Sequence, residues 1–189
     1  MNEHRTEEYN TQSLWTCFFM GLQPIQCWDD FYLWDRFLMD RPEIRSVIEI
    51  GTGGGGASLF LLMQSIARGF TFDTFDQFAA PAWLISPLAK RLELERHFHV
   101  GDVWITQKAE VHRLIGDPAN HPMVLFCDGG DKPREFREFG GLLHAGDYVV
   151  VHDWMNEFGP QDMKPVAVTE LLVAECDGLH SMTRFMVKP

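Results

Sequence analysis

Short apolar runs alternate with amphipathic stretches along most of the chain. Apolar runs rich in β-branched residues predict buried strands, and apolar positions at helical spacing predict helices. The expected strands cover 47–50, 71–75, 97–100, 123–127, 148–151 and 180–188, and the expected helices cover 28–39, 58–68, 81–94, 105–115, 136–143 and 165–175. This alternation predicts an α/β fold, Rossmann-like and doubly wound, with a mainly parallel sheet and helices on both faces.

Aromatic residues are dense before the first predicted strand. A helix over 28–39 places Phe31, Trp34 and Leu38 on one face, and Pro42 ends it by disfavouring helical geometry in Arg41. We expect this helix to pack on the sheet, with a substrate lid or a dimer face as alternatives. With 189 residues, 46% of them hydrophobic, the chain is expected to form one domain, of which residues 1–43 are an aromatic-rich helical cap.

A glycine-rich turn follows the first predicted strand. Gly51 and Thr52 precede four consecutive glycines, and an apolar helix start comes next. Glycine accepts positive φ and lets a ligand approach the backbone, while the first N–H groups of a helix are unpaired. The pattern predicts a site for a nucleotide-like ligand. Because Gly51, Gly53 and Gly56 also match the G-x-G-x-x-G spacing of dinucleotide-binding folds, the glycines alone leave the cofactor open.

Four acidic residues stand where predicted strands end: Asp76, Asp102, Asp128 and Asp153. Ligands of parallel α/β sheets bind at the carboxyl ends of the strands, so we expect these side chains to meet at one edge. Asp76 lies 25 residues after Gly51, which suits an acid that binds ribose hydroxyls. Asp102 is expected to make a second contact with the nucleoside. A helix cap or a solvated acid is the alternative for each.

A second set of polar residues suits a divalent ion. Asp128, His152 and Asp153 offer carboxylate and imidazole ligands, and the imidazole makes Mn²⁺ or Fe²⁺ worth testing beside Mg²⁺. The alternative is a hydrogen-bonded histidine without metal. Asp131 or Lys132 is placed to take a proton from a bound hydroxyl, which requires a lowered pKa for Lys132. A turn with solvated charges is the alternative for this pair.

Composition narrows the partners. A net charge of −11, from 16 basic and 27 acidic residues, disfavours a nucleic-acid partner. Cys17, Cys27, Cys127 and Cys176 show no metal or redox spacing, and the first residues do not resemble a signal peptide. No apolar run approaches the roughly 20 residues of a membrane span. We therefore expect a cytoplasmic protein with reduced thiols, a small-molecule substrate and no membrane partner.

The residues resemble a known family. EIGTGGG at 49–55, followed by Asp76, Asp102 and Asp128, is similar to the motifs of class I S-adenosylmethionine-dependent methyltransferases, whose sheet is of a seven-stranded type. The nearest likeness is to O-methyltransferases of the cephalosporin hydroxylase, macrolide-sugar and rhamnosyl type, and a more distant one is to catechol-type enzymes. Three segments carry the likeness: MGLQPIQCWDDFYLW at 20–34, IEIGTGGGGASLFL at 48–61 and FCDGGDKPREFREFGGLLHAGDYVVVHDW at 126–154.

The resemblance implies roles for individual residues. It implies that Glu49 and the 51–55 loop hold the amino-acid part of S-adenosylmethionine, Asp76 the ribose and Asp102 the adenine amine. The full set of cofactor-binding residues implied is Glu49, Gly51, Thr52, Gly53, Gly55, Asp76, Gln77, Asp102 and Asp128. The metal ligands implied, for Mg²⁺ or Mn²⁺, are Asp128, His152 and Asp153, and the catalytic residues are Asp131, Lys132 and His152. His152 stands where the closest relatives usually carry a carboxylate, and Asp131 where they often carry histidine.

The reaction that the resemblance implies is O-methylation of a small molecule such as a sugar, a catechol or a natural product. Methyl transfer from a sulfonium is an in-line displacement, so the protein must position the acceptor oxygen and ease its deprotonation. Two alternatives stay open: a nicotinamide-dependent oxidoreductase, from the glycine spacing, and an inactive cofactor-binding or scaffold protein, from His152 and Asp131. A homodimer through the aromatic N-terminal stretch is also left open.

Overall fold

The computed structural model describes residues 19–22, 25–78 and 91–189. Cys17 and most of the predicted helix 81–94 therefore fall outside the described residues. Cys27, Cys127 and Cys176 are buried and unbridged. None of the helices in the described ranges is long and apolar enough to cross a membrane.

The described strands form one mainly parallel sheet. Its order is β3-β2-β1-β4-β5-β7-β6, in which β7 runs antiparallel to both of its neighbours. The strands are β1 (Ser46–Ile50), β2 (Thr71–Asp76), β3 (Phe98–Val100), β4 (Met123–Cys127), β5 (Tyr148–Val151), β6 (Thr169–Leu171) and β7 (Arg184–Val187). The predicted fold class is confirmed, since the switch of strand order at β1 and β4 is that of a doubly wound sheet.

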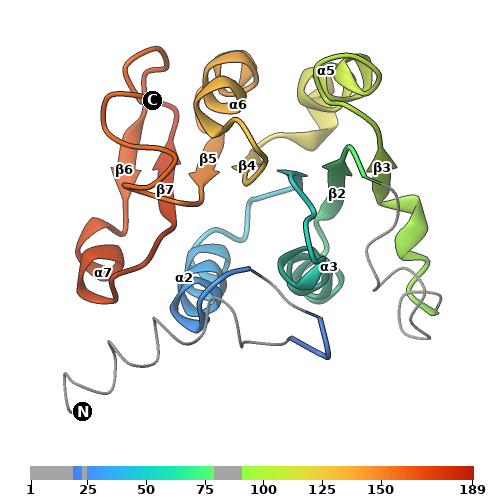
Figure 1. Cartoon of the computed structure of the whole chain (residues 1–189), viewed down its shortest axis with the longest axis horizontal. Helices are drawn as coiled ribbons and strands as arrows, with labels where there is room; N and C mark the ends of the chain where they lie inside the picture. The colour runs from blue at the N-terminus through green and yellow to red at the C-terminus, as the bar shows by residue number, and fades with distance from the viewer. Residues whose placement is uncertain (1–18, 23–24, 79–90) are drawn as a thin grey trace.

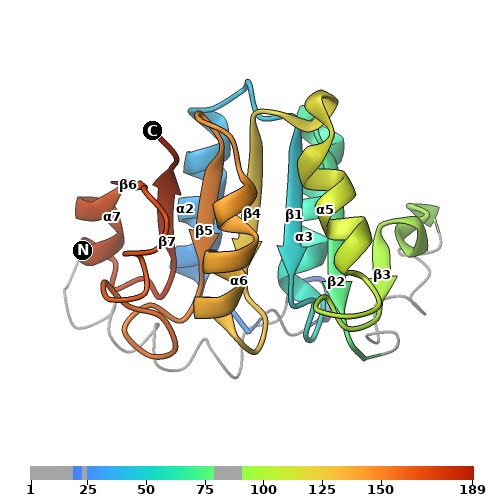
Figure 2. The same ribbon diagram turned by 90° about the horizontal axis from the view of Figure 1, so that it is seen from above.

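Helices cover both faces of the sheet. Figure 1 shows α2, α3 and α7 on one face and α5 and α6 on the other, and Figure 2 shows α5 and α6 in front of the strands. The helices are α2 (Trp28–Met39), α3 (Gly56–Arg68), α5 (Lys108–Gly116), α6 (Lys132–Glu138) and α7 (Val173–Gly178), with 3₁₀ turns η2 (Leu94–Arg96), η3 (Pro118–Asn120) and η4 (Gly140–Leu142). Because both faces are covered, every residue of β1, β4 and β5 is buried, as their apolar sequences require.

The helix predicted over 28–39 forms within the predicted bounds and packs on the sheet. Its Trp34 ring lies 5.0 Å from the Phe126 ring of β4 and 5.3 Å from the Phe185 ring of β7. Asp30 caps the helix start, where its carboxylate accepts the backbone N–H of Cys27. The aromatic stretch thus supplies core to the sheet and carries Asp30 into the interior.

Two predicted helices differ from the structure. The prediction of a helix over 165–175 is wrong, because residues Thr169–Leu171 pair with β7 as an edge strand before the short helix α7. Good helix formers in this segment are overridden by the hydrogen bonds that β7 offers. The helix predicted over 136–143 begins earlier, at Lys132, because Asp131 caps it and Pro133 suits its first turn. It also ends earlier, at Glu138, and a 3₁₀ turn follows over Gly140–Leu142.

Candidate active site

The glycine turn after β1 lies against the end of β4. Gly51 has a φ of 97°, and a Cβ atom added there would lie 2.3 Å from the backbone oxygen of Asp128. The Gly51 N–H donates to Phe75 O at 2.8 Å, and the Asp128 N–H donates to Ile50 O at 2.9 Å. Only glycine fits this close approach, which brings the loop and Asp128 together.

The next glycines connect the loop to Asp76. The Gly53 N–H donates to Asp76 Oδ2 at 3.0 Å, and Asp76 Oδ1 accepts the Phe78 N–H at 3.0 Å. Gly55, with a φ of 81°, is the residue that caps the start of α3. The backbone of the loop and the carboxylate of Asp76 thus form one wall of a cavity.

This cavity has a volume of about 530 Å³ and opens at the carboxyl ends of β1, β2 and β4. That volume is in the range of small-molecule sites, which run from about 300 to 1,000 Å³. Predicted residues on its wall are Gly51, Gly53, Asp76, Gln77, Asp102, Asp128 and Asp131, and apolar neighbours are Ile50, Phe75, Phe78, Val103 and Trp104. The expectation that the strand-end acids meet is borne out for Asp76, Asp102 and Asp128.

Glu49, Thr52 and Gly55 are absent from the residues that line this cavity. Glu49 is fully buried and accepts the hydroxyl of Ser58, and burial raises the pKa of its carboxyl to about 8. Its second oxygen, Oε1, has no hydrogen-bond partner in the described part of the chain. Thr52 bonds its hydroxyl to that of Thr74 at 2.6 Å. These residues support the loop from behind, and Glu49 keeps one oxygen available.

Trp104 is a cavity residue that the sequence analysis did not single out. Its backbone N–H donates to Asp102 Oδ1 at 2.7 Å. Its ring stacks on the ring of Phe139, with 4.9 Å between the two ring centres. The guanidinium carbon of Arg134 lies 4.0 Å from the centre of the Trp104 ring. These contacts fix the Trp104 side chain on the cavity wall beside Asp102.

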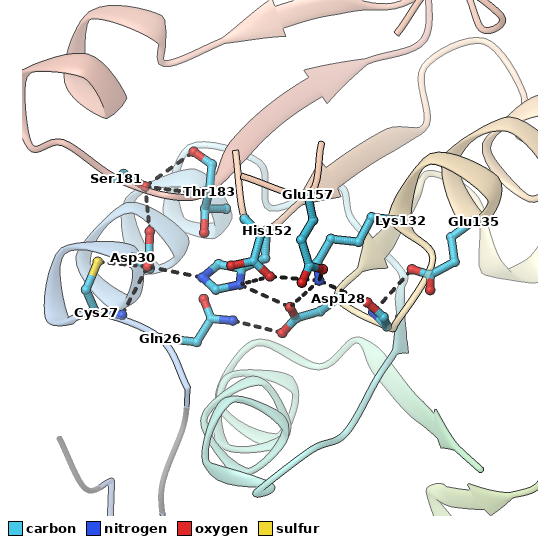
Figure 3. Close-up of polar contacts among 12 residues, drawn as sticks. Gln26, Cys27, Asp30, Asp128, Lys132, Glu135, His152, Glu157, Ser181 and Thr183 are labelled. Atoms are coloured by element: carbon cyan, nitrogen blue, oxygen red, sulfur yellow. Dashed lines mark hydrogen bonds and ion pairs between the residues drawn. The ribbon is translucent and has the colours of Figure 1, made fainter. Parts of the chain in front are cut away.

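The predicted metal ligands lie together. Candidate ligand atoms of Asp128, His152 and Asp153 all fall within 4.8 Å of one another. His152 Nδ1 lies 3.1 Å from Asp128 Oδ1 (Figure 3). The same atom lies 3.4 Å from Asp153 Oδ2. Burial lowers the pKa of His152, but the surrounding carboxylates raise it to about 10. The carboxylates thus favour the protonated imidazole, which donates to Asp128 through Nδ1, while Nε2 has no hydrogen-bond partner among the described residues.

Lys132 occupies the same cluster. Its side chain is buried, and Nζ lies 2.7 Å from Asp153 Oδ2, 2.8 Å from Glu157 Oε2 and 2.9 Å from Gly129 O. Burial alone lowers the pKa of this lysine, but the acids Asp128, Asp153 and Glu157 raise it above its ordinary value. The requirement of a lowered pKa for Lys132 as a base is thus contradicted, because the ammonium is held by carboxylates.

Asp131 caps a helix and lies on the cavity wall, and its role as a base stays a prediction. It caps α6 by accepting the Arg134 N–H at 3.3 Å, and it is exposed on the cavity wall. Glu135 lies beside it, buried, and accepts the N–H groups of Gly129 at 3.2 Å and Asp131 at 3.4 Å. Burial raises the pKa of Glu135 to about 7. Glu135 fixes the shape of the turn after β4 and was not predicted.

Two further polar residues reach the cluster from the start of α2. Gln26 Nε2 donates to Asp128 Oδ2 at 2.8 Å, and the fully buried Asp30 lies 3.8 Å from His152 Nε2. The sequence held a signal for Asp30, since it shares a helix face with Trp34 and Phe37, where an acid is out of place. Gln26 offered no comparable signal.

Comparisons with known proteins agree on the fold. No protein-family model and no curated protein sequence matches the chain. Among solved structures, "cmcI-N160 SAH" is similar at 15% identity and a TM-score of 0.59, over 91% of this chain and 81% of that one. The O-methyltransferase from Bacillus cereus in complex with SAH is similar at 14% identity and a TM-score of 0.55, over 98% of this chain and 90% of that one. The chain thus has the Rossmann-like fold of the class I S-adenosylmethionine-dependent methyltransferases.

Proposed function

We propose that the chain is an S-adenosylmethionine-dependent methyltransferase that methylates a hydroxyl group of a small molecule, such as a sugar, a catechol or a natural product. The observation that carries the proposal is the cavity of about 530 Å³ that joins the glycine loop to Asp76 and Asp102. The similarity to structures that contain SAH supports the choice of cofactor over a nicotinamide.

The residues of the cavity fit this cofactor. Asp76 suits ribose hydroxyls, and Asp102, beside Trp104, suits the amine of an adenine. Glu49 is buried outside the cavity lining and supports the glycine loop through Ser58. When bound, S-adenosylmethionine supplies an electrophilic methyl group on a positively charged sulfur. The glycine loop contributes backbone contact without side-chain bulk.

The acceptor is served by residues beyond β4. Asp131, exposed on the cavity wall, takes the proton from the acceptor hydroxyl. His152, protonated and buried, donates a hydrogen bond to Asp128 and holds that carboxylate in place. The chain positions the acceptor oxygen in line with the methyl group, which is the larger part of catalysis in such a displacement.

A divalent metal forms no part of the proposed reaction. Asp128, His152 and Asp153 converge as a metal site would, but Lys132 Nζ lies 2.7 Å from Asp153 Oδ2. The donor set, in which an ammonium group already contacts a carboxylate oxygen, does not fit Mg²⁺ or Mn²⁺.

The test is calorimetric titration of the metal-stripped chain with S-adenosylmethionine and, separately, with NADH. We expect micromolar binding of the first and none of the second, and an Asp76→Ala variant is expected to bind at least tenfold more weakly. Asp40→Ala is the matched control, because Asp40 is an exposed acid at the end of α2. Turnover is then sought with catechols and vicinal diols, read as SAH and methylated product.

The outcomes separate the alternatives. Binding of NADH in place of S-adenosylmethionine would establish the oxidoreductase. Tight binding of S-adenosylmethionine without turnover of any acceptor class would favour an inactive, cofactor-binding protein.

A further inference from the structure

We propose that Lys132 is a built-in cation that takes the place of a divalent metal ion between Asp128 and Asp153, so that the chain works without a metal. The consequence for catalysis rests on the proposed methyltransferase function. The absence of a metal site rests only on the contacts of this cluster.

The ammonium group of Lys132 has a complete set of partners. An ammonium carries three N–H donors, and three oxygens lie within 2.7 to 2.9 Å of Nζ, on Asp153, Glu157 and Gly129. Asp128 Oδ1 lies 4.0 Å from Nζ, so the cation lies close to both acids. This is the arrangement in which a buried lysine is stable, because burial of an unpaired charge is costly.

The acids that a metal would need are engaged. Gln26 donates to Asp128 Oδ2 at 2.8 Å, and His152 Nδ1 lies 3.1 Å from Asp128 Oδ1. Divalent ions bind oxygen ligands at about 2.0 to 2.6 Å, so an ion on both acids would lie within a few ångströms of the Lys132 ammonium. Entry of the ion would require these hydrogen bonds to break and two cations to share one small space.

The fold keeps Lys132 in this position. Lys132 is the first residue of α6, and its side chain, 4% exposed, folds back onto the carbonyl of Gly129 three residues earlier. Glu157, from the loop after β5, closes over the amine (Figure 3). A metal that bound both acids would have to displace this buried side chain from its three oxygen partners.

The charge of Lys132 has a use in the proposed reaction. A metal ion at this site would neutralise the carboxylates and ease formation of an anionic acceptor oxygen. Lys132 offsets part of the negative charge of Asp153 and Glu157, which reduces their repulsion of a negative charge that develops in the cavity. Lys132 is thus a positioning residue and not the base.

The experiment is a titration with Mn²⁺ alone, followed by electron paramagnetic resonance and calorimetry on the chain after treatment with a chelator. Wild type is expected to bind no stoichiometric Mn²⁺ at millimolar concentration. Lys132→Met keeps the length of the side chain and removes the charge. This variant is expected to bind one Mn²⁺ per chain, at least tenfold more tightly than wild type does. Lys132→Met with Asp153→Asn is expected to lose that binding. Lys164→Met, at an exposed lysine outside the cluster, is the control.

Two results would overturn the proposal. One is the binding of one Mn²⁺ by the wild-type chain together with loss of that binding in Asp153→Asn. This measurement does not depend on whether a Lys132 variant folds. The other is a folded Lys132→Met chain that binds none. S-adenosylmethionine is titrated into the same samples. Failure to bind it would contradict the proposed function, whereas the Mn²⁺ result tests the role of Lys132 by itself.

Discussion

Replacement of Gly51 by alanine is the sharpest test of how the glycine loop packs against β4. The added Cβ would lie 2.3 Å from Asp128 O, whereas ordinary van der Waals contact begins at 3.4 Å. The loop or the end of β4 must therefore move by roughly 1 Å. That movement strains two backbone hydrogen bonds, from Gly51 to Phe75 and from Asp128 to Ile50.

The expected cost has two parts. A φ of 97° disfavours any residue with a Cβ by about 1 to 2 kcal/mol. Weakening of the two hydrogen bonds adds about 1 kcal/mol each. The free energy of unfolding should thus fall by about 3 to 4 kcal/mol. With a urea dependence of about 2 to 3 kcal/mol per molar for a chain of this size, the midpoint should fall by about 1 to 2 M.

Urea unfolding followed by circular dichroism measures this loss, and calorimetry on the folded variant measures binding of S-adenosylmethionine. Gly141→Ala is the control, since an added Cβ there meets no atom within 4 Å, and its free energy of unfolding should stay within about 0.5 kcal/mol of wild type. A Gly51→Ala chain as stable as this control, with unchanged affinity for the cofactor, would refute the close approach of the loop to β4.

Three other predictions concern the cavity. Asp131→Asn should lower kcat by about 100-fold or more, because asparagine cannot accept a proton, and initial-rate measurements test this. The free energy of unfolding should not change, because asparagine caps a helix as well as aspartate does, and urea unfolding tests this. Asp102→Ala should weaken binding of S-adenosylmethionine by about tenfold in calorimetry. An affinity equal to that of wild type would show that Asp102 does not contact the adenine. Burial raises the pKa of Glu135 from 4.5 to about 7. Between these two pH values the folded chain holds a proton that the unfolded chain has released, so the free energy of unfolding should fall as pH rises from 4.5 to 7. Glu135→Gln should flatten that part of the stability profile, measured by urea midpoints, and an unchanged slope would contradict the assignment.

Local signals in the sequence were sufficient for most of the fold. The continuous apolar runs 123–127 and 148–151 form buried strands because each segment must hide side chains on both faces. The helix over 28–39 has apolar residues at helical spacing and a proline after its end. Thr169–Leu171 carried no such signal, since an edge strand is decided by the partner strand that lies beside it.

The sequence by itself also determined the glycine loop and the row of acids at the strand ends, because chain geometry brings the carboxyl ends of parallel strands to one edge of the sheet. Only the tertiary structure decided what the second cluster does. Gln26 lies 102 residues from Asp128 along the chain, and Glu157 lies 25 residues from Lys132. The protonation of His152 and Lys132 depends on the burial and the carboxylates that these distant segments bring together, and such electrostatic coupling exists only once the chain has folded.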